Sequence, residues 1–239
     1  MHLPANFLRM RTALLGAIAC AASLLFAQPP AQSRLVTDLD NMVRSRFERV
    51  LGISNLEHYS VFRGQDETHP VAQMTVRVIY RKGVGKRYTI LSQSGSALIL
   101  HFGLKALLKG EEAINDPAAV SQSWITSDNY AMIPDPARTQ TLQGRLCVAL
   151  SIRPYHRAPN MVVGTVWVDP TDSAILRVEG VASKSPSIFA GTTHMMRDYS
   201  VIDGFAQATH ARAESTGLFG HTVVVIDYSD YQIQLAPAR

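Results

Sequence analysis

Turn signals recur about every 10 to 15 residues from Gly144 to the end of the chain, and this spacing restricts the fold more than any other feature. The segments between the turns are rich in β-branched and other apolar residues, and they predict strands over residues 144–153, 162–169, 175–182, 193–202, 206–215 and 221–235. Connections this short join antiparallel neighbours, because a parallel pair needs a crossover of about a dozen residues or more. We therefore expect an antiparallel meander in this half of the chain.

The clearest alternation between apolar and polar residues lies in residues 71–81, just before a turn at Gly83–Gly85. Its apolar positions are Ala72, Met74, Val76, Val78 and Tyr80. Successive side chains of a strand point to opposite faces, so this pattern predicts a strand with one buried face and one mostly solvated face. Residues 87–94 complete the predicted hairpin, and a further strand is expected over 58–63.

Three segments break the β pattern and predict helices. Apolar residues recur at threes and fours over 35–51, with charged residues between them and Gly52 following, which predicts one amphipathic helix. Residues 96–114 carry an apolar run with little polar surface, so a helix there would need cover on more than one side. The Asp-Pro pair that opens residues 116–124 is typical of a helix start and predicts a short helical piece.

The apolar residues of the last predicted strand change parity part-way along. Ile226 and Tyr228 occupy even positions, whereas Tyr231 and Ile233 occupy odd ones. A regular strand cannot keep both pairs on one face. Either a β-bulge near Ser229–Asp230 restores the common face, or both faces of the strand are covered there.

Residues 1–27 have the layout of a secretory signal peptide. Arg9 and Arg11 give a positive start, residues 12–26 are uncharged and mostly apolar, and Ala27 is a small residue at the end of this run. The run is shorter than the roughly 20 residues that span a bilayer. We therefore expect an exported, periplasmic protein whose signal is cleaved near Ala27.

Two other roles for this segment stay open, an uncleaved membrane anchor and a lipoprotein signal with Cys20 as the lipidated residue. With cleavage, residues 28–34 form a short lead-in and residues 35–239 form a single domain with a sizeable core. The chain has 23 basic and 19 acidic side chains, and two of the basic ones lie in the signal. The remaining charge of +2 gives no basis for nucleic-acid binding, and the one remaining thiol, Cys147, gives no internal disulfide.

Motifs for catalysis, metals and cofactors are scarce. None of the eight histidines lies three or four residues from another, although helical or finger-like zinc sites need such spacing. His210, Arg212 and Glu214 share one face of a predicted strand and are the best polar set for acid–base chemistry. A charged outward face explains the same three residues more simply. We expect no enzyme activity, no metal and no cofactor.

Three segments of the second half carry a family resemblance. Residues 164–169 have the sequence Gly-Thr-Val-Trp-Val-Asp, residues 175–180 follow with Ile-Leu-Arg-Val-Glu-Gly, and residues 199–204 continue with Tyr-Ser-Val-Ile-Asp-Gly, ahead of Glu214. Together with the expected export, this pattern resembles the LolA/LolB-like superfamily of periplasmic lipoprotein-carrier proteins, also called outer-membrane lipoprotein-sorting-like. The resemblance implies an α+β fold, in which a curved antiparallel sheet forms an unclosed β-barrel with helices packed on its concave side.

What the resemblance implies about function is a binding or carrier protein for lipid or lipoprotein acyl chains, held in a hydrophobic cavity. A membrane-associated donor or acceptor protein would be its partner, and nucleic acid would not. The alternative is an envelope sensor or scaffold domain of the same fold with no transferable ligand. Candidate cavity residues are Leu98, Phe102, Leu146, Val148, Leu150, Val166, Trp167 and Val168. The last two cannot both face inward on a regular strand.

Overall fold

The computed structural model describes residues 31–184, 191–217 and 220–237, and the predicted signal peptide lies outside this part of the chain. Its strands form one sheet in which every neighbouring pair is antiparallel. In chain order they are β1 (Val50–Arg63), β2 (Ala72–Arg81), β3 (Gly85–Gly95), β4 (Tyr130–Leu142), β5 (Arg145–Pro154), β6 (Val162–Val168), β7 (Ile175–Ala182), β8 (Thr193–Ile202), β9 (Phe205–Gly217) and β10 (Gly220–Leu235).

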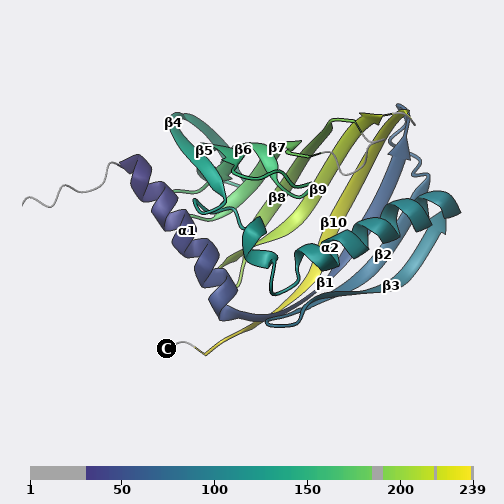
Figure 1. The fold of residues 1–239 in the computed structure, drawn as a ribbon, viewed down its shortest axis with the longest axis horizontal. Helices are drawn as coiled ribbons and strands as arrows, with labels where there is room; N and C mark the ends of the chain where they lie inside the picture. Colours follow the sequence, from purple (N-terminus) through teal and green to yellow (C-terminus); the bar gives the residue numbers. More distant parts are fainter. Residues whose placement is uncertain (1–30, 185–190, 218–219, 238–239) are drawn as a thin grey trace, which may run out of the picture.

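The sheet is open and curved. Its spatial order is β3-β2-β1-β10-β9-β8-β7-β6-β5-β4. β3 and β4 are therefore the edge strands, and each pairs with a neighbour on one side only. Both long helices, α1 (Ala31–Arg49) and α2 (Lys105–Ile114), lie across the concave face (Figure 1). The predicted fold class is thereby confirmed. No helix within the described residues combines the length and the apolar character that a bilayer crossing requires.

The strands predicted from alternation are confirmed, and β7 and β8 have the predicted bounds. One strand, β4, was not predicted. It contains Pro134 and Pro136, its middle is exposed, and its pairing with β5 shifts register between Asp135 and Thr139. Proline has no N–H to donate and is confined to edge strands and bulges, which is where β4 lies.

The N-terminal helix ends earlier than predicted. α1 stops at Arg49, and β1 begins at Val50 with no loop between them. Gly52 is a residue of β1, paired with Gln234 of β10, and is not a helix stop. The strand expected over 58–63 therefore starts eight residues sooner, because the apolar residues at the end of the helical pattern continue directly into the sheet.

The second helix consists of a π-helical turn, η1 (Ile99–Leu104), that runs directly into α2. Leu100, Leu104 and Leu108 are buried against β1 and β2. The opposite side is open, since Leu98 is 65% exposed and Phe102 is 71% exposed. The expectation that this helix is covered on more than one side is therefore wrong. A short 3₁₀ helix, η2 (Val120–Ser123), follows near the predicted position.

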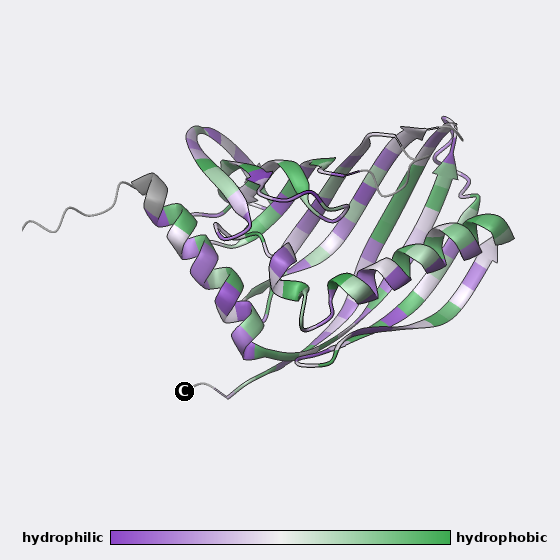
Figure 2. Cartoon of the chain, viewed as in Figure 1, coloured by the Kyte–Doolittle hydropathy of each residue, from purple (hydrophilic) through white to green (hydrophobic). Residues whose placement is uncertain are grey.

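Two core clusters lie side by side on the concave face. One, under η1 and α2, contains Tyr59, Met74 and Val76, and the other, under α1, contains Leu39 and Leu150. Apolar and polar residues alternate along the strands, as Figure 2 shows. This alternation sends most apolar side chains of the sheet toward the helices, and a smaller cluster with Cys147, Trp167 and Leu176 packs on the outer face.

The parity change in the last strand is a β-bulge, which confirms the first of the two alternatives. Along β10, Ser229 pairs with Leu56, whereas Gln232 already pairs with Ser54, and Asp230 has a φ of 55°. The extra residue turns the second half of β10 over, so Tyr228 and Tyr231 both face the concave side.

Candidate functional site

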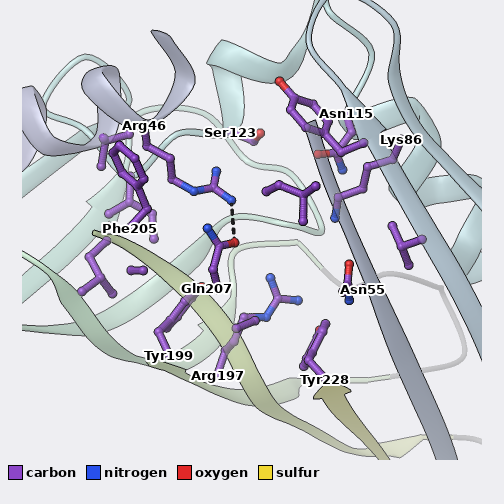
Figure 3. A pocket seen from close by; sticks show the side chains of 18 of the residues that line it. Arg46, Asn55, Lys86, Asn115, Ser123, Arg197, Tyr199, Phe205, Gln207 and Tyr228 are labelled. Carbon is purple, nitrogen blue, oxygen red and sulfur yellow. Dashed lines mark hydrogen bonds between the residues drawn. The ribbon is translucent and has the colours of Figure 1, made fainter. Parts of the chain in front are cut away.

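A cavity of about 280 Å³ lies on the concave face between the two core clusters. α1 and the segment after η2 bound it on one side, and α2 bounds it on the other. Side chains from β1, β8, β9 and β10 form its floor (Figure 3). The cavity arises because each helix packs on its own part of the sheet and neither fills the space between them.

One side of the cavity is apolar. α1 contributes Leu39, Met42, Val43 and Phe47, and the segment after η2 contributes Trp124. Phe47 and Trp124 stack with their ring centroids 4.2 Å apart and an angle of 19° between the planes, which ties α1 to this segment. This side presents aliphatic and aromatic surface to whatever occupies the cavity.

Arg46 projects from α1 into the same cavity. Its Nη2 donates to the Oε1 of Gln207 on β9 at 3.2 Å, and its guanidinium lies 5.3 Å from the centroid of the Phe47 ring. Its Nε is buried without a partner. Burial lowers the pKa of Arg46, as expected for a cation removed from water.

Arg197 reaches the cavity from the sheet side, on β8. Tyr228, Tyr199 and the carboxylate of Glu111 raise the pKa of Arg197 well above its ordinary value against the effect of burial, and Arg197 also donates a hydrogen bond to Tyr199. Burial raises the pKa of Tyr228 itself, so this phenol is protonated at neutral pH. Tyr228 therefore offers Arg197 a hydroxyl dipole and not a negative charge.

In the described ranges, no carboxylate oxygen lies within 4.0 Å of a side-chain nitrogen of Arg46 or Arg197, so neither arginine forms an ion pair there. Two acids line the cavity. Glu111 on α2 lies 3.7 Å from Lys86 on β3, and Glu57 on β1 accepts a hydrogen bond from the hydroxyl of Tyr59. Glu57 lies on β1, which is three strands from β8 along the curved sheet.

The eight candidate cavity residues from the sequence lie in three different environments. Leu150, Val166 and Val168 are fully buried in the cluster under α1, with Val148 half-buried on the same strand as Leu150. Leu98, Phe102 and Leu146 are exposed.

Trp167 points to the outer face of the sheet, where it packs with Cys147 and donates its indole N–H to Glu179 at 2.9 Å. It thus lies opposite Val168, as the strand geometry requires. None of the eight is among the residues that line the cavity, and a role for them in ligand binding stays a prediction.

The polar lining residues were not predicted, although the sequence contains a signal for them. Arg46 follows Met42 by four residues and Val43 by three, which places it within the apolar face of α1. Arg197 shares its side of β8 with Tyr199. A charge in the middle of an apolar face is the signal, because solvated charges occupy the opposite face.

The set of His210, Arg212 and Glu214 lies on the other face of β9 and makes surface ion pairs. His210 Nδ1 lies 2.8 Å from Asp227, and Arg212 binds Glu67 through both terminal nitrogens at 2.6 and 2.8 Å and Glu214 at 3.2 Å. The hydrogen bonds that Arg212 donates to Glu67 and Glu214 raise the pKa of its guanidinium. Across the described ranges, no three His, Cys, Asp or Glu side chains are grouped so that they could hold a metal ion.

No family model matches the chain, and the comparison with curated proteins found no relative. Solved structures similar to it include a domain described as an outer membrane lipoprotein-sorting protein from Vibrio parahaemolyticus, with 14% identity, a TM-score of 0.47, and coverage of 84% of this chain and 93% of that one. A LolA superfamily protein from Nitrosomonas europaea has 12% identity, a TM-score of 0.45, and coverage of 87% and 96%.

A DUF1329 family protein from Desulfovibrio piger also has 12% identity and a TM-score of 0.45, with coverage of 88% and 96%. Two of these three descriptions name the family that the sequence motif resembles. The similarity is one of overall architecture, at a level that assigns no function to this chain.

Proposed function

We propose that this chain is a periplasmic binding or carrier protein that holds an acyl chain in the cavity between α1, α2 and the concave face. The observation that supports this most directly is the apolar side of the cavity, formed by α1 and Trp124 and placed between two separate core clusters. Because each helix packs on its own cluster, the two can separate to admit a chain without breaking the sheet.

The size of the cavity favours a single chain of medium length. Its volume of about 280 Å³ is just below the roughly 300–1,000 Å³ typical of ligand pockets. A ligand with several acyl chains would require the helices to move apart. Each buried methylene contributes ~0.8 kcal/mol, so about eight of them contribute about 6 kcal/mol. Association costs about 4 to 15 kcal/mol, so an apolar chain alone binds weakly and a polar contact is needed as well.

Two measurements test the proposal. Organic extraction of protein purified from its native envelope, followed by mass spectrometry, should yield a co-purified lipid. The neutral probe 1-N-phenylnaphthylamine should bind the delipidated protein with increased fluorescence. Val43→Trp, which fills the cavity, should abolish this signal, whereas Asn41→Trp on the exposed side of α1 should preserve it.

An empty extract together with no probe binding would refute the carrier function and favour the sensor or scaffold role. A membrane-associated donor or acceptor belongs to the carrier proposal, since a bound chain must be loaded and delivered. Crosslinking in intact envelopes, compared between the wild type and Val43→Trp, should capture such a partner only when the cavity can be loaded.

Export is tested independently of binding. The proposed signal peptide predicts a mature protein that starts near Gln28 and is released from the periplasm by osmotic shock. Intact-mass measurement of the released protein checks the cleavage. A chain that retains residues 1–27 and stays with the membrane would support the anchor alternative.

A further inference from the structure

The cavity contains two guanidinium groups that form no ion pair with a carboxylate of the described part of the chain. Arg46 comes from α1 and Arg197 from β8, and both side chains point into the pocket (Figure 3). Burial of a charge is costly unless a counter-charge or several hydrogen bonds accompany it. Of the two acids in the lining, Glu111 is paired with Lys86 and acts on Arg197 only from beyond ion-pair distance, and Glu57 lies three strands from Arg197.

Gln207 shows which kind of group would complete this site. It is 2% exposed, and its Oε1 must face Arg46, because a guanidinium has donors only. That orientation turns its amide nitrogen, Nε2, away from Arg46, and Nε2 is buried without a partner. The Nε of Arg46 is likewise without a partner. Both unpaired groups are donors, so the matching ligand atom is an acceptor.

Carboxylate and phosphate groups combine an acceptor with a negative charge. The planar fork of a guanidinium binds either group through two parallel hydrogen bonds. Water also supplies acceptors but leaves both positive charges uncompensated. The neighbouring phenol of Tyr228 is neutral at neutral pH and does not compensate them either.

The apolar side formed by Phe47, Val43 and Trp124 adjoins these donors in the same cavity. An acid group and a hydrocarbon chain on one molecule would therefore satisfy both parts. We propose that the cavity binds single-chain anionic amphiphiles, with the carboxylate or phosphate held by Arg46, Arg197 and Gln207 and the chain against the apolar side. This inference rests on the proposed function and names the chemical class of its ligand.

The test compares ligands that differ only at the head. Displacement of 1-N-phenylnaphthylamine from the delipidated wild-type protein is measured with decanoate, decyl phosphate, 1-decanol and inorganic phosphate. We expect the two amphiphilic anions to bind at least about tenfold more tightly than 1-decanol, the effect of one charge-assisted hydrogen bond. Whichever of decanoate and decyl phosphate binds more tightly identifies the source of the acid group.

Variants locate the effect at the arginines. Arg46→Gln and Arg197→Gln should each weaken decanoate binding about 10- to 100-fold and 1-decanol binding by less than about threefold, so that the preference for decanoate falls. Arg34→Gln, on the same helix as Arg46 but exposed and 3.7 Å from Asp38, should change neither. The comparison of decanoate with 1-decanol needs only wild-type protein, so the test stands even where a variant does not fold.

The outcomes separate this inference from the proposed function. Equal binding of decanoate and 1-decanol would overturn the acid site and leave the acyl-chain cavity intact. Absence of binding by every amphiphile and by the neutral probe would overturn both. Inorganic phosphate that binds as tightly as decyl phosphate would also overturn the inference, because the chain would then contribute nothing.

Discussion

Arginines on the two faces of the sheet differ in whether they form ion pairs with carboxylates. On the outer face, Arg145 lies 2.7 Å from Asp169, Arg177 lies 2.5 Å from Asp198, and Arg212 lies 2.6 Å from Glu67. In the cavity, Arg46 and Arg197 have no such partner among the described residues.

A paired, partly buried charge contributes to stability, whereas a buried charge without a partner costs stability unless hydrogen bonds compensate it. The contrast fits a structural role for the outer arginines and the proposed binding role for the inner ones.

The largest expected effect concerns the cavity. Decanoate at about 100 times its Kd should raise the free energy of unfolding of the wild type by about 2.7 kcal/mol. At the same concentration, the double variant Arg46→Gln/Arg197→Gln should gain less than about 0.5 kcal/mol, because its affinity is lower by two orders of magnitude or more. Urea unfolding with and without decanoate measures both gains. Equal stabilisation of the two proteins by decanoate would show that the arginines of the inner face do not bind the ligand.

The next effect concerns the outer face. Although burial acts to raise it, hydrogen bonds from Thr171 and Arg145 lower the pKa of Asp169. Asp169→Asn should reduce the free energy of unfolding by about 2 kcal/mol at pH 7, since it leaves Arg145 with one carboxylate instead of two.

A lowered carboxyl pKa gives stability that is complete above the unfolded-state value of about 4 and disappears as pH falls through the folded-state pKa. The difference between wild type and Asp169→Asn should therefore shrink below about pH 4. The midpoints of urea unfolding of both proteins, recorded from pH 7 to pH 2, measure this difference in stability. A constant difference would show that the lost charge is not its cause.

A smaller change is expected for the inner face. Arg197→Met removes a half-buried cation that makes no ion pair, and it should lower the free energy of unfolding by less than about 1 kcal/mol. The same variant should lose its preference for decanoate over 1-decanol. A loss of stability as large as that of Asp169→Asn would place Arg197 with the structural arginines of the outer face.

The smallest effect is the reference for the others. Arg34 is mostly exposed, and its contact with Asp38 is a surface i, i+4 pair. Arg34→Gln should change the free energy of unfolding by less than about 0.5 kcal/mol. A larger change would mean that arginine substitutions perturb this protein irrespective of where they lie.

Most of the fold was predictable because the strands follow a regular period of two. The parity change at Ser229–Asp230 left two alternatives, a bulge or two covered faces, and the structure has the bulge, which turns Tyr231 toward the concave side. β4 was not predicted because its prolines interrupt the alternation of apolar and polar residues. The end of α1 was misplaced because Val50 and Leu51 satisfy the helical pattern and the strand pattern equally well.

The cavity was harder to predict than the sheet. Alternation assigns a residue to a face but does not say which part of that face a helix covers. Leu150 and Val166 lie on the concave face, yet α1 packs directly on them. The lining at the junction of the two clusters includes charged residues such as Arg46, which a search for apolar positions leaves out.

The direct junction between α1 and β1 restricts how the helix can swing. The last turn of α1 is clamped, because Lys82 Nζ donates to the carbonyl oxygen of Glu48 at 2.7 Å and the N–H of Ala236 donates to that of Arg49 at 2.7 Å. α1 is about 28 Å long, and Asp40 and Arg44 connect its middle to Ser127 and Asp128. A rotation of about 10° about Val50 would move Ala31 by about 5 Å and Arg46 by about 1 Å. Entry of the proposed ligand by such a rotation would require the contacts at the middle of α1 to break, and Arg46 would stay nearly in place.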